Sequence, residues 1–149
     1  MEAAIEYERD FYSWLMRNAG LLREGRFTEI DVENVAEELE AMGRREKREI
    51  VSRLTVLLVH LLKWKYQAVR RSRSWENTIL TQRMDIKELL EDSPSLHYEI
   101  EKRIKRAYKK ARLKAEDETG IDKKYFPKSC PFSPEQILEK AFFPEEENT

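Results

Sequence analysis

The most apolar stretch of the chain runs from Leu54 to Leu62, where no position carries a charged side chain. Charged residues make up 38% of the sequence as a whole. Coiled as a helix, this stretch is apolar nearly all the way round, and such a helix lies in the interior of a fold. It is too short for a membrane span, which needs roughly 20 apolar residues. We therefore expect a central helix inside a single helical domain over residues 1–149, with no membrane partner.

Apolar residues recur at helical spacing along most of the chain, and neither an alternating strand pattern nor a hairpin turn appears. The pattern predicts an all-α bundle of five or six helices around the central one. The expected helices cover residues 5–23, 32–42, a central helix that ends near 67 or 69, then 75–91, 96–119 and a short helix after 133.

Particular residues mark the expected helix boundaries. Gly25 is a plausible stop for the first helix, and Asp31 is a good N-cap for the second. Gly43 leaves two alternatives, because it can end the second helix or lie inside a longer one at a cost of about 1 kcal/mol relative to alanine. We favour a break or kink at Gly43. Ser74 is the expected cap of the next helix, and residues 92–95 separate that helix from the one that follows.

The helix expected over residues 96–119 has the cleanest amphipathic pattern. Its apolar face carries Leu96, Ile100, Ile104, Ala107, Tyr108, Ala111 and Ala115. Gly120 follows it as a stop. In the tail, Ser133, Pro134 and Gln136 have the pattern of a capping box. We therefore expect a short helix there that docks on the bundle through the apolar residues Ile137, Leu138 and Phe142.

The net charge of −1 conceals a strong segregation of charge along the chain. Residues 1–50 hold 13 acidic and 8 basic residues, residues 51–115 hold 7 acidic and 16 basic, and residues 116–149 hold 9 acidic and 4 basic. A basic middle between acidic ends can pair within the fold, between copies, or with an outside polyanion. The single cysteine, Cys130, and an acidic N-terminal segment unlike a signal peptide lead us to expect a cytosolic location.

The chain resembles a bacterial family, rich in cyanobacterial members, that is catalogued as domain of unknown function family 29. The resemblance covers nearly the whole chain, and its most specific part is the HLLKW motif of residues 60–64 followed by RRS and SW at residues 70–75. Other matching positions are Tyr7, Asp10, Phe11, Trp14, Arg26, Phe27, Asp31, Glu37, Glu38, Gly43, Tyr66, Pro94, Phe126, Pro127, Cys130, Pro131 and Gln136. The resemblance implies an all-helical protein without an assigned activity.

One polar constellation deserves consideration as a site. Glu37, Glu38 and Glu40 lie on the second expected helix, where Glu38 borders the apolar face. His60 borders a face of the central helix, so one carboxylate and one imidazole can meet between helices. Di-iron bundles use such residues, but the repeated Glu-x-x-His unit is missing here. We interpret Glu37, Glu38 and His60 as a structural polar cluster and predict no catalytic residue, metal or cofactor. A metal-dependent hydrolase is the weakest alternative.

Two basic regions are candidates for binding an anion or a partner. The connection after the central helix contains Arg70, Arg71, Arg73 and Trp75, and the helix over residues 96–119 carries Lys102, Arg106, Lys109 and Lys110 away from its apolar face. Cations with aromatics are typical of RNA and single-stranded DNA binding. The arginines can equally pair with the acidic residues 37–40 of the same chain or of another copy, and we favour that interpretation.

The central helix also has more apolar surface than one amphipathic neighbour can cover. Val51, Val59 and Leu62 lie opposite Leu57 and Leu61, and Leu113 projects among lysines. We expect the tail or a second chain to cover this surface, and homodimerisation is the favoured outcome. The sequence therefore predicts a non-enzymatic interaction module that self-associates, with nucleic-acid binding as the alternative. No small-molecule ligand is predicted.

Overall fold

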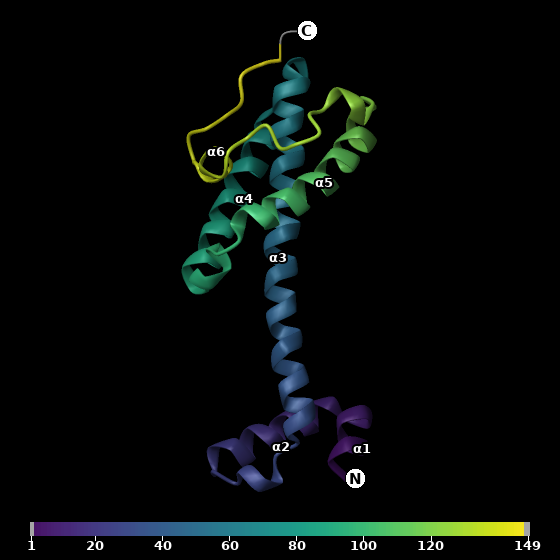
Figure 1. The fold of residues 1–149 in the computed structure, drawn as a ribbon, viewed down its shortest axis with the longest axis vertical. Coiled ribbons are helices and arrows are strands. Elements are labelled where there is room, and N and C mark those ends of the chain that lie inside the picture. Colours follow the sequence, from purple (N-terminus) through teal and green to yellow (C-terminus); the bar gives the residue numbers. More distant parts are fainter. Residues whose placement is uncertain (1, 148–149) are drawn as a thin grey trace. The chain divides into compact units, whose positions relative to one another are not determined.

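The computed structural model describes the backbone of residues 2–147 and the side chains of residues 6–147. Within that part of the chain the fold consists of helices without strands, so the predicted all-α class is confirmed. The α-helices of Figure 1 are α1 (Glu2–Arg9), α2 (Phe11–Arg23), α3 (Val32–Tyr66), α4 (Arg73–Asp92), α5 (Ile100–Thr119) and α6 (Pro134–Leu138). Short 3-10 helices cover Phe27–Glu29, Ala68–Arg70, Pro94–His97 and Lys123–Tyr125.

The chain divides into two compact units, Met1–Glu46 and Lys47–Thr149, which we call the N-terminal unit and the C-terminal unit. Helix α3 contributes its first part to the N-terminal unit and its remainder to the C-terminal unit. The single domain expected over residues 1–149 stays a prediction.

Helix α3 runs without interruption through Gly43, so the predicted break or kink at this glycine is wrong. An isolated glycine costs a helix about 1 kcal/mol, and the strong helix formers around it offset that cost. Two ion pairs also bridge this stretch, since Arg44 lies 3.1 Å from Glu37 and 3.9 Å from Glu40. The helices expected before and after Gly43 are therefore one helix.

The single helix expected over residues 5–23 is divided at Asp10 into α1 and α2. Asp10 has a non-helical backbone with φ −143° and ψ 77°, and its carboxylate accepts a hydrogen bond from the Ser13 amide at 3.1 Å. A short carboxylate side chain competes in this way for backbone donors and favours a helix start over a helix interior. Helix α3 begins directly after Asp31, at the predicted position.

Two more boundaries differ from their predicted positions. The N-cap of α4 is Ser72 rather than Ser74, and its side chain accepts from the Trp75 amide at 3.2 Å. Helix α5 begins at Ile100, because Glu99 adopts a left-handed backbone with φ 61° that separates it from the preceding 3-10 helix. Gly120 ends α5 with φ 76°, as predicted for a glycine at this position.

The apolar half of α3 forms the core of the C-terminal unit. Its buried residues are Ile50, Val51, Leu54, Thr55, Leu57, Leu58, Val59, Leu61 and Leu62. Figure 1 shows α4 and α5 beside this half of the helix. The whole predicted apolar face over residues 96–115 is buried as well. Val51, Val59 and Leu62 are buried in a core that includes Phe126, Phe132 and Ile137, so the chain itself covers this surface of α3, whereas Leu113 is exposed.

The C-terminal segment docks on α4 through Arg83. This buried side chain donates hydrogen bonds to the carbonyls of Ile137 at 2.8 Å, Gln136 at 3.1 Å and Phe142 at 2.7 Å. Burial lowers the pKa of the guanidinium to about 10. The predicted capping box of α6 is confirmed at Ser133 and Gln136, although α6 ends at Leu138 and Phe142 lies beyond it. A buried arginine thus connects the tail to the bundle.

None of the described helices combines the length and the apolar character that a crossing of the bilayer requires.

Candidate interaction surfaces

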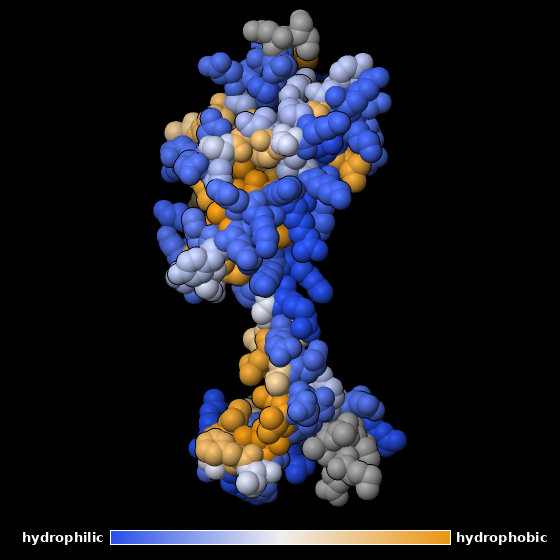
Figure 2. Space-filling model, in the orientation of Figure 1, coloured by the Kyte–Doolittle hydropathy of each residue, from blue (hydrophilic) through white to orange (hydrophobic). Residues whose placement is uncertain are grey.

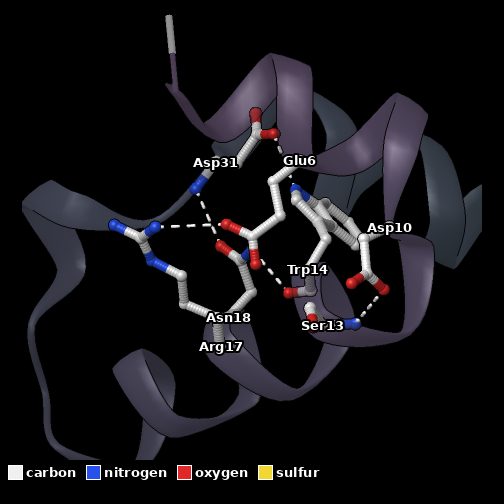
Figure 3. A network of polar contacts seen from close by, with 7 residues as sticks. All are labelled: Glu6, Asp10, Ser13, Trp14, Arg17, Asn18 and Asp31. Atoms are coloured by element: carbon white, nitrogen blue, oxygen red, sulfur yellow. Dashed lines mark hydrogen bonds and ion pairs between the residues drawn. The ribbon is translucent and has the colours of Figure 1, made fainter.

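A polar network holds α2 and the start of α3 together inside the N-terminal unit (Figure 3). The indole of Trp14 donates to the Asp31 carboxylate at 2.9 Å, and the Asp31 amide donates to the side-chain oxygen of Asn18 at 3.0 Å. Asn18 in turn donates to the Trp14 carbonyl at 2.9 Å. These three residues close a ring of hydrogen bonds, and Trp14 and Asn18 are buried. The network fixes the angle at which α3 leaves the loop.

Asp31 is the charged member of this network. Asn34 also donates to its carboxylate, at 2.8 Å. Hydrogen bonds from Asn34 and Trp14 hold the pKa of the Asp31 carboxyl below its ordinary value, although partial burial acts in the opposite direction. The ionised form of Asp31 is therefore the form that stabilises the N-terminal unit.

An aromatic cluster lies beside the network. The Trp14 ring is 4.6 Å from the ring of Tyr7 and 5.7 Å from that of Phe11, between centroids. The Tyr7 hydroxyl donates to the Glu38 carboxylate, and this hydrogen bond raises the pKa of Tyr7 above its ordinary value. Helix α1 is thereby connected to both α2 and α3.

The N-terminal unit has a small interior and a large apolar surface. Trp14 and Leu21 are its buried apolar side chains within the described residues. The large apolar side chains that it exposes are Phe11, Tyr12, Leu15, Met16, Leu22, Phe27, Val32, Leu39 and Met42. Figure 2 shows apolar side chains over α2 and the first turns of α3. Contiguous apolar surface of this kind marks an interaction site more often than scattered apolar residues do.

The apolar positions of α3 in this unit follow a heptad. Val32, Val35, Leu39 and Met42 are spaced alternately by three and four residues, which is the spacing of a coiled-coil seam. Leu39 is 63% exposed and Met42 is 57% exposed. This seam has the pattern of a helix that packs against another helix, yet within the described residues Val32, Leu39 and Met42 remain exposed and Val35 is only partly buried.

Charge along the same part of α3 is ordered. Acidic residues occupy its beginning, and Arg44 and Arg45 follow after Gly43; the acidic residues are Glu33, Glu37, Glu38 and Glu40. The intrahelical pairs of Arg44 with Glu37 and Glu40 are solvent-exposed and contribute little to stability. The helix therefore presents a negative half and a positive half to any partner.

The structure does not bring the predicted cluster of Glu37, Glu38 and His60 together. All three lie on one helix, where only residues three or four positions apart are neighbours. Glu37 pairs with Arg44, Glu38 accepts from Tyr7, and the His60 ring is 2.9 Å from the Val56 carbonyl. Burial lowers the pKa of His60. The interhelical cluster required a break at Gly43, which does not exist.

The predicted basic connection is partly turned inward. Arg71 donates to the Trp64 carbonyl at 2.8 Å, and its guanidinium lies 4.9 Å from the Trp64 ring centroid. The Trp75 ring is 5.5 Å from the ammonium of Lys63 and is half-buried. Arg70 and Arg73 are exposed. Arg71 and Trp75 therefore have partners inside the C-terminal unit, and the binding role of the four residues stays a prediction.

The predicted basic face of α5 is exposed at Lys102, Arg106, Lys109 and Lys110. Among the described residues, the lysines and arginines of α5 form one ion pair with a carboxylate, between Lys102 and Glu99 at 3.7 Å. Arg103, four residues after Glu99, donates to the Tyr98 carbonyl at 2.6 Å. Most of these cations are therefore available to an outside anion.

No cluster of three or more histidine, cysteine, aspartate or glutamate side chains suited to a metal ion occurs within residues 6–147. Cys130 is half-buried, its Sγ lies 3.5 Å from the Phe132 carbonyl oxygen, and burial raises the pKa of its thiol. A thiol with a raised pKa is a poor nucleophile at neutral pH.

The sequence pattern assigned Leu39 and Met42 to an inward stripe and did not identify them as surface residues. One feature of the sequence does indicate that these residues are exposed. The first 46 residues contain several amphipathic helix faces but few apolar residues outside them. Two short helices and one helix end cannot cover one another on all of those faces.

A model described as "Domain of unknown function DUF29" matches residues 6–143. The chain belongs to the DUF29 family. Neither the comparison with curated proteins nor the comparison with solved structures gave a match. Membership in DUF29 covers both units and assigns no activity to either.

Proposed function

We propose that this DUF29 protein is a macromolecular interaction module whose N-terminal unit pairs with a second copy of the chain. The observation that supports the proposal is the exposed apolar surface of that unit, and above all the heptad seam of α3 at Val32, Leu39 and Met42. Burial of one leucine or methionine contributes about 1.5–3 kcal/mol. In a symmetric pair the same seam residues become buried in both copies, so each position contributes twice to the stability of the dimer.

The order of charge on α3 favours a second copy in the antiparallel orientation. In a parallel pair, the acidic half of one helix lies beside the acidic half of the other, and like charges repel. In an antiparallel pair, Glu37 and Glu38 of one copy lie near Arg44 and Arg45 of the other. The same orientation places Leu39 of one copy beside Met42 of the other, as a coiled-coil seam requires.

The test is the molar mass in solution, measured by size-exclusion chromatography with light scattering over a concentration series. We expect a mass near twice 17.9 kDa for the wild-type chain. The variant Leu39→Glu/Met42→Glu places charge in the seam, and we expect its dissociation constant to rise at least about 100-fold. A wild-type chain that stays monomeric at micromolar concentration contradicts the proposal.

The C-terminal unit offers a matched control. Leu113 and Met84 lie on helices and are 51% and 62% exposed, close to the values for Leu39 and Met42. The variant Leu113→Glu/Met84→Glu makes the same chemical changes outside the proposed interface. It should retain the dimeric mass. Loss of the dimer in both variants indicates a general effect of added charge and also contradicts the proposal.

Binding of RNA or single-stranded DNA is the second candidate, and the exposed cations of α5 favour it. The relevant side chains are Arg70, Arg73, Lys102, Arg106 and Lys110. Filter binding of mixed RNA and single-stranded DNA, at about 50 mM salt and then at higher salt, measures this activity. Phosphate contacts require an affinity that falls steeply with salt. Absence of binding at the lower salt concentration removes this candidate.

A further inference from the structure

A cavity of about 520 Å³ lies within the C-terminal unit, between α5 and the segment that leads into α6. From α5 it is lined by a stripe of residues three and four positions apart, and from the segment by residues 128–130 and Pro134. Pockets of 300–1,000 Å³ are typical of sites for small organic ligands. Its volume is therefore suited to one small molecule.

The floor and the walls of this cavity are largely apolar. Ile104, Tyr108, Cys130 and Pro134 line it. The Tyr108 hydroxyl donates to the Pro127 carbonyl, and burial raises the pKa of this phenol well above its ordinary value. The pKa of the Cys130 thiol is raised by burial as well. Both side chains therefore stay neutral at physiological pH and contribute uncharged surface to the cavity.

The rim is strongly basic. Lys105, Lys109, Arg112 and Lys128 line the cavity, and Glu101 is the acidic residue among the lining side chains. Within the part of the chain that the structure describes, none of these four cations forms an ion pair with a carboxylate, whereas Lys102 outside the cavity does. The cavity thus presents positive charge that the protein itself does not neutralise.

Arg112 is one of these four cations. One terminal nitrogen of its guanidinium donates to the Lys123 carbonyl at 2.8 Å and to that of Phe126 at 3.3 Å. These bonds position the group without neutralising it. Its Nε is buried and has no hydrogen-bond partner among the described residues. Because the Nε has almost no accessible surface, the contribution of Arg112 to the cavity is its positive charge rather than this donor.

We propose that this cavity binds a small amphipathic anion, a molecule with an apolar body and a carboxylate, sulfonate or phosphate head. The apolar wall accepts the body, and the lysines of the rim hold the head by charge-assisted hydrogen bonds. This proposal departs from the sequence-based prediction, which included no small-molecule ligand. The inference does not rest on self-association, because the seam and the cavity belong to different units.

Isothermal titration calorimetry of the purified full chain tests the proposal with two anionic probes, decanoate and anilinonaphthalene sulfonate. Decanol and decyltrimethylammonium serve as neutral and cationic counterparts. We expect at least one anionic probe to bind with one site per chain and the cationic counterpart to bind at least about tenfold more weakly, since a charge-assisted hydrogen bond contributes more than a neutral one. Absence of binding by both anionic probes overturns the proposal.

Two charge-matched double variants locate the site. Lys109→Glu/Lys128→Glu reverses charge at the rim, whereas Lys102→Glu/Lys110→Glu reverses the same number of charges on α5 outside the cavity. The rim variant should weaken binding at least about tenfold, and the outer variant should change it by less than about threefold. Circular dichroism verifies that both variants remain helical. Equal affinity of the two variants overturns the proposal.

A bound ligand also stabilises the folded chain. Saturating decanoate or anilinonaphthalene sulfonate should raise the melting temperature of the wild type and of the outer variant by similar amounts, and that of the rim variant by less. If RNA rather than a small anion is the natural occupant of these cations, the outer variant loses RNA affinity as strongly as the rim variant, and neither probe binds stoichiometrically. That result overturns the cavity as a small-molecule site.

Discussion

The two units of this DUF29 chain use the same kind of amphipathic helix with opposite results. In the C-terminal unit, the apolar half of α3 is covered by α4, α5 and the tail, and residues such as Leu57 and Leu61 have no exposed surface. In the N-terminal unit, the first part of α3 exposes Leu39 and Met42, and α2 exposes Phe11. The difference lies in how much chain is available to cover each helix.

This comparison indicates that the two units have different tasks. Monomeric proteins rarely expose large contiguous apolar patches, and such patches mark interaction sites more often than scattered apolar residues do. Most of the exposed large apolar side chains of the described residues belong to the N-terminal unit. The proposed partner binding by the N-terminal unit and the proposed small-ligand binding by the C-terminal unit are consistent with this difference.

Removal of the tail's anchor should make the C-terminal unit resemble the N-terminal one. Arg83→Met keeps an apolar stem but deletes the donors that the carbonyls of Gln136, Ile137 and Phe142 accept. Buried carbonyls without a partner cost about 1–3 kcal/mol each, so we expect a loss of about 3 kcal/mol in the free energy of unfolding. Urea denaturation, monitored by circular dichroism, measures this loss.

The control for this variant is Arg106→Met, which removes an exposed arginine of α5. It should change the free energy of unfolding by less than about 0.5 kcal/mol. Hydrogen exchange supplies a second measurement, because Arg83→Met should increase exchange in residues 134–143. If Arg83→Met is as stable as Arg106→Met, the tail is held by its apolar contacts alone.

A smaller effect should follow from Asp31→Asn, which loosens the N-terminal unit. The pKa of the Asp31 carboxyl is lowered in the folded state, mainly by the hydrogen bond from Asn34. Its contribution to stability is therefore fully present above the ordinary carboxyl pKa of 3.8 and is lost as pH falls below it. We expect Asp31→Asn to cost about 1 kcal/mol near neutral pH, because solvent reaches the group.

Thermal denaturation between about pH 6 and pH 2.5 measures this dependence. The difference between wild type and Asp31→Asn should shrink as the pH falls. Glu8→Gln is the control, because Glu8 is an exposed carboxylate of the same unit. A difference between wild type and Asp31→Asn that is independent of pH contradicts the role assigned to the ionised carboxylate.

The smallest effect is a gain of stability in the helix that both units share. A methyl group added at Gly43 or at Gly20 meets no atom within 4 Å. Gly43→Ala should therefore raise the free energy of unfolding by about 1 kcal/mol, and Gly20→Ala in α2 should do about the same. Urea denaturation of Gly43→Ala in the Leu39→Glu/Met42→Glu background measures the free energy of unfolding without a contribution from the proposed dimer. A destabilising Gly43→Ala in that background contradicts a continuous, unstrained α3.

The sequence was sufficient to predict the elements whose signals are local. The face of α5 from Ile100 to Ala115, the stop at Gly120 and the capping box of Ser133 were predicted correctly, because helical periodicity and capping depend on neighbouring residues. The break at Asp10 and the continuity of α3 through Gly43 were not predicted. Both depend on small free-energy differences between a helix and its interruption.

The candidate sites were harder to predict than the fold. Arg71 donates to the carbonyl of Trp64, and Arg83 donates to the carbonyl of Ile137, which lies far away in the sequence. No pattern of residue types indicates such backbone partners. The exposed seam at Leu39 and Met42 looked like any buried stripe. Periodicity identifies the face that packs, but only the structure reveals whether the same chain supplies its partner.

The central claim, that a second copy covers the seam of α3, is tested most directly by mixing two charge-altered chains. Glu37→Lys/Glu38→Lys gives residues 37–45 four cations and one carboxylate, and Arg44→Glu/Arg45→Glu gives the same residues carboxylates only. Each variant alone should be monomeric by light scattering, because either helix orientation then brings like charges together. An equimolar mixture should recover a mass near twice 17.9 kDa. A mixture that stays monomeric, while the wild type is dimeric, contradicts pairing through this helix.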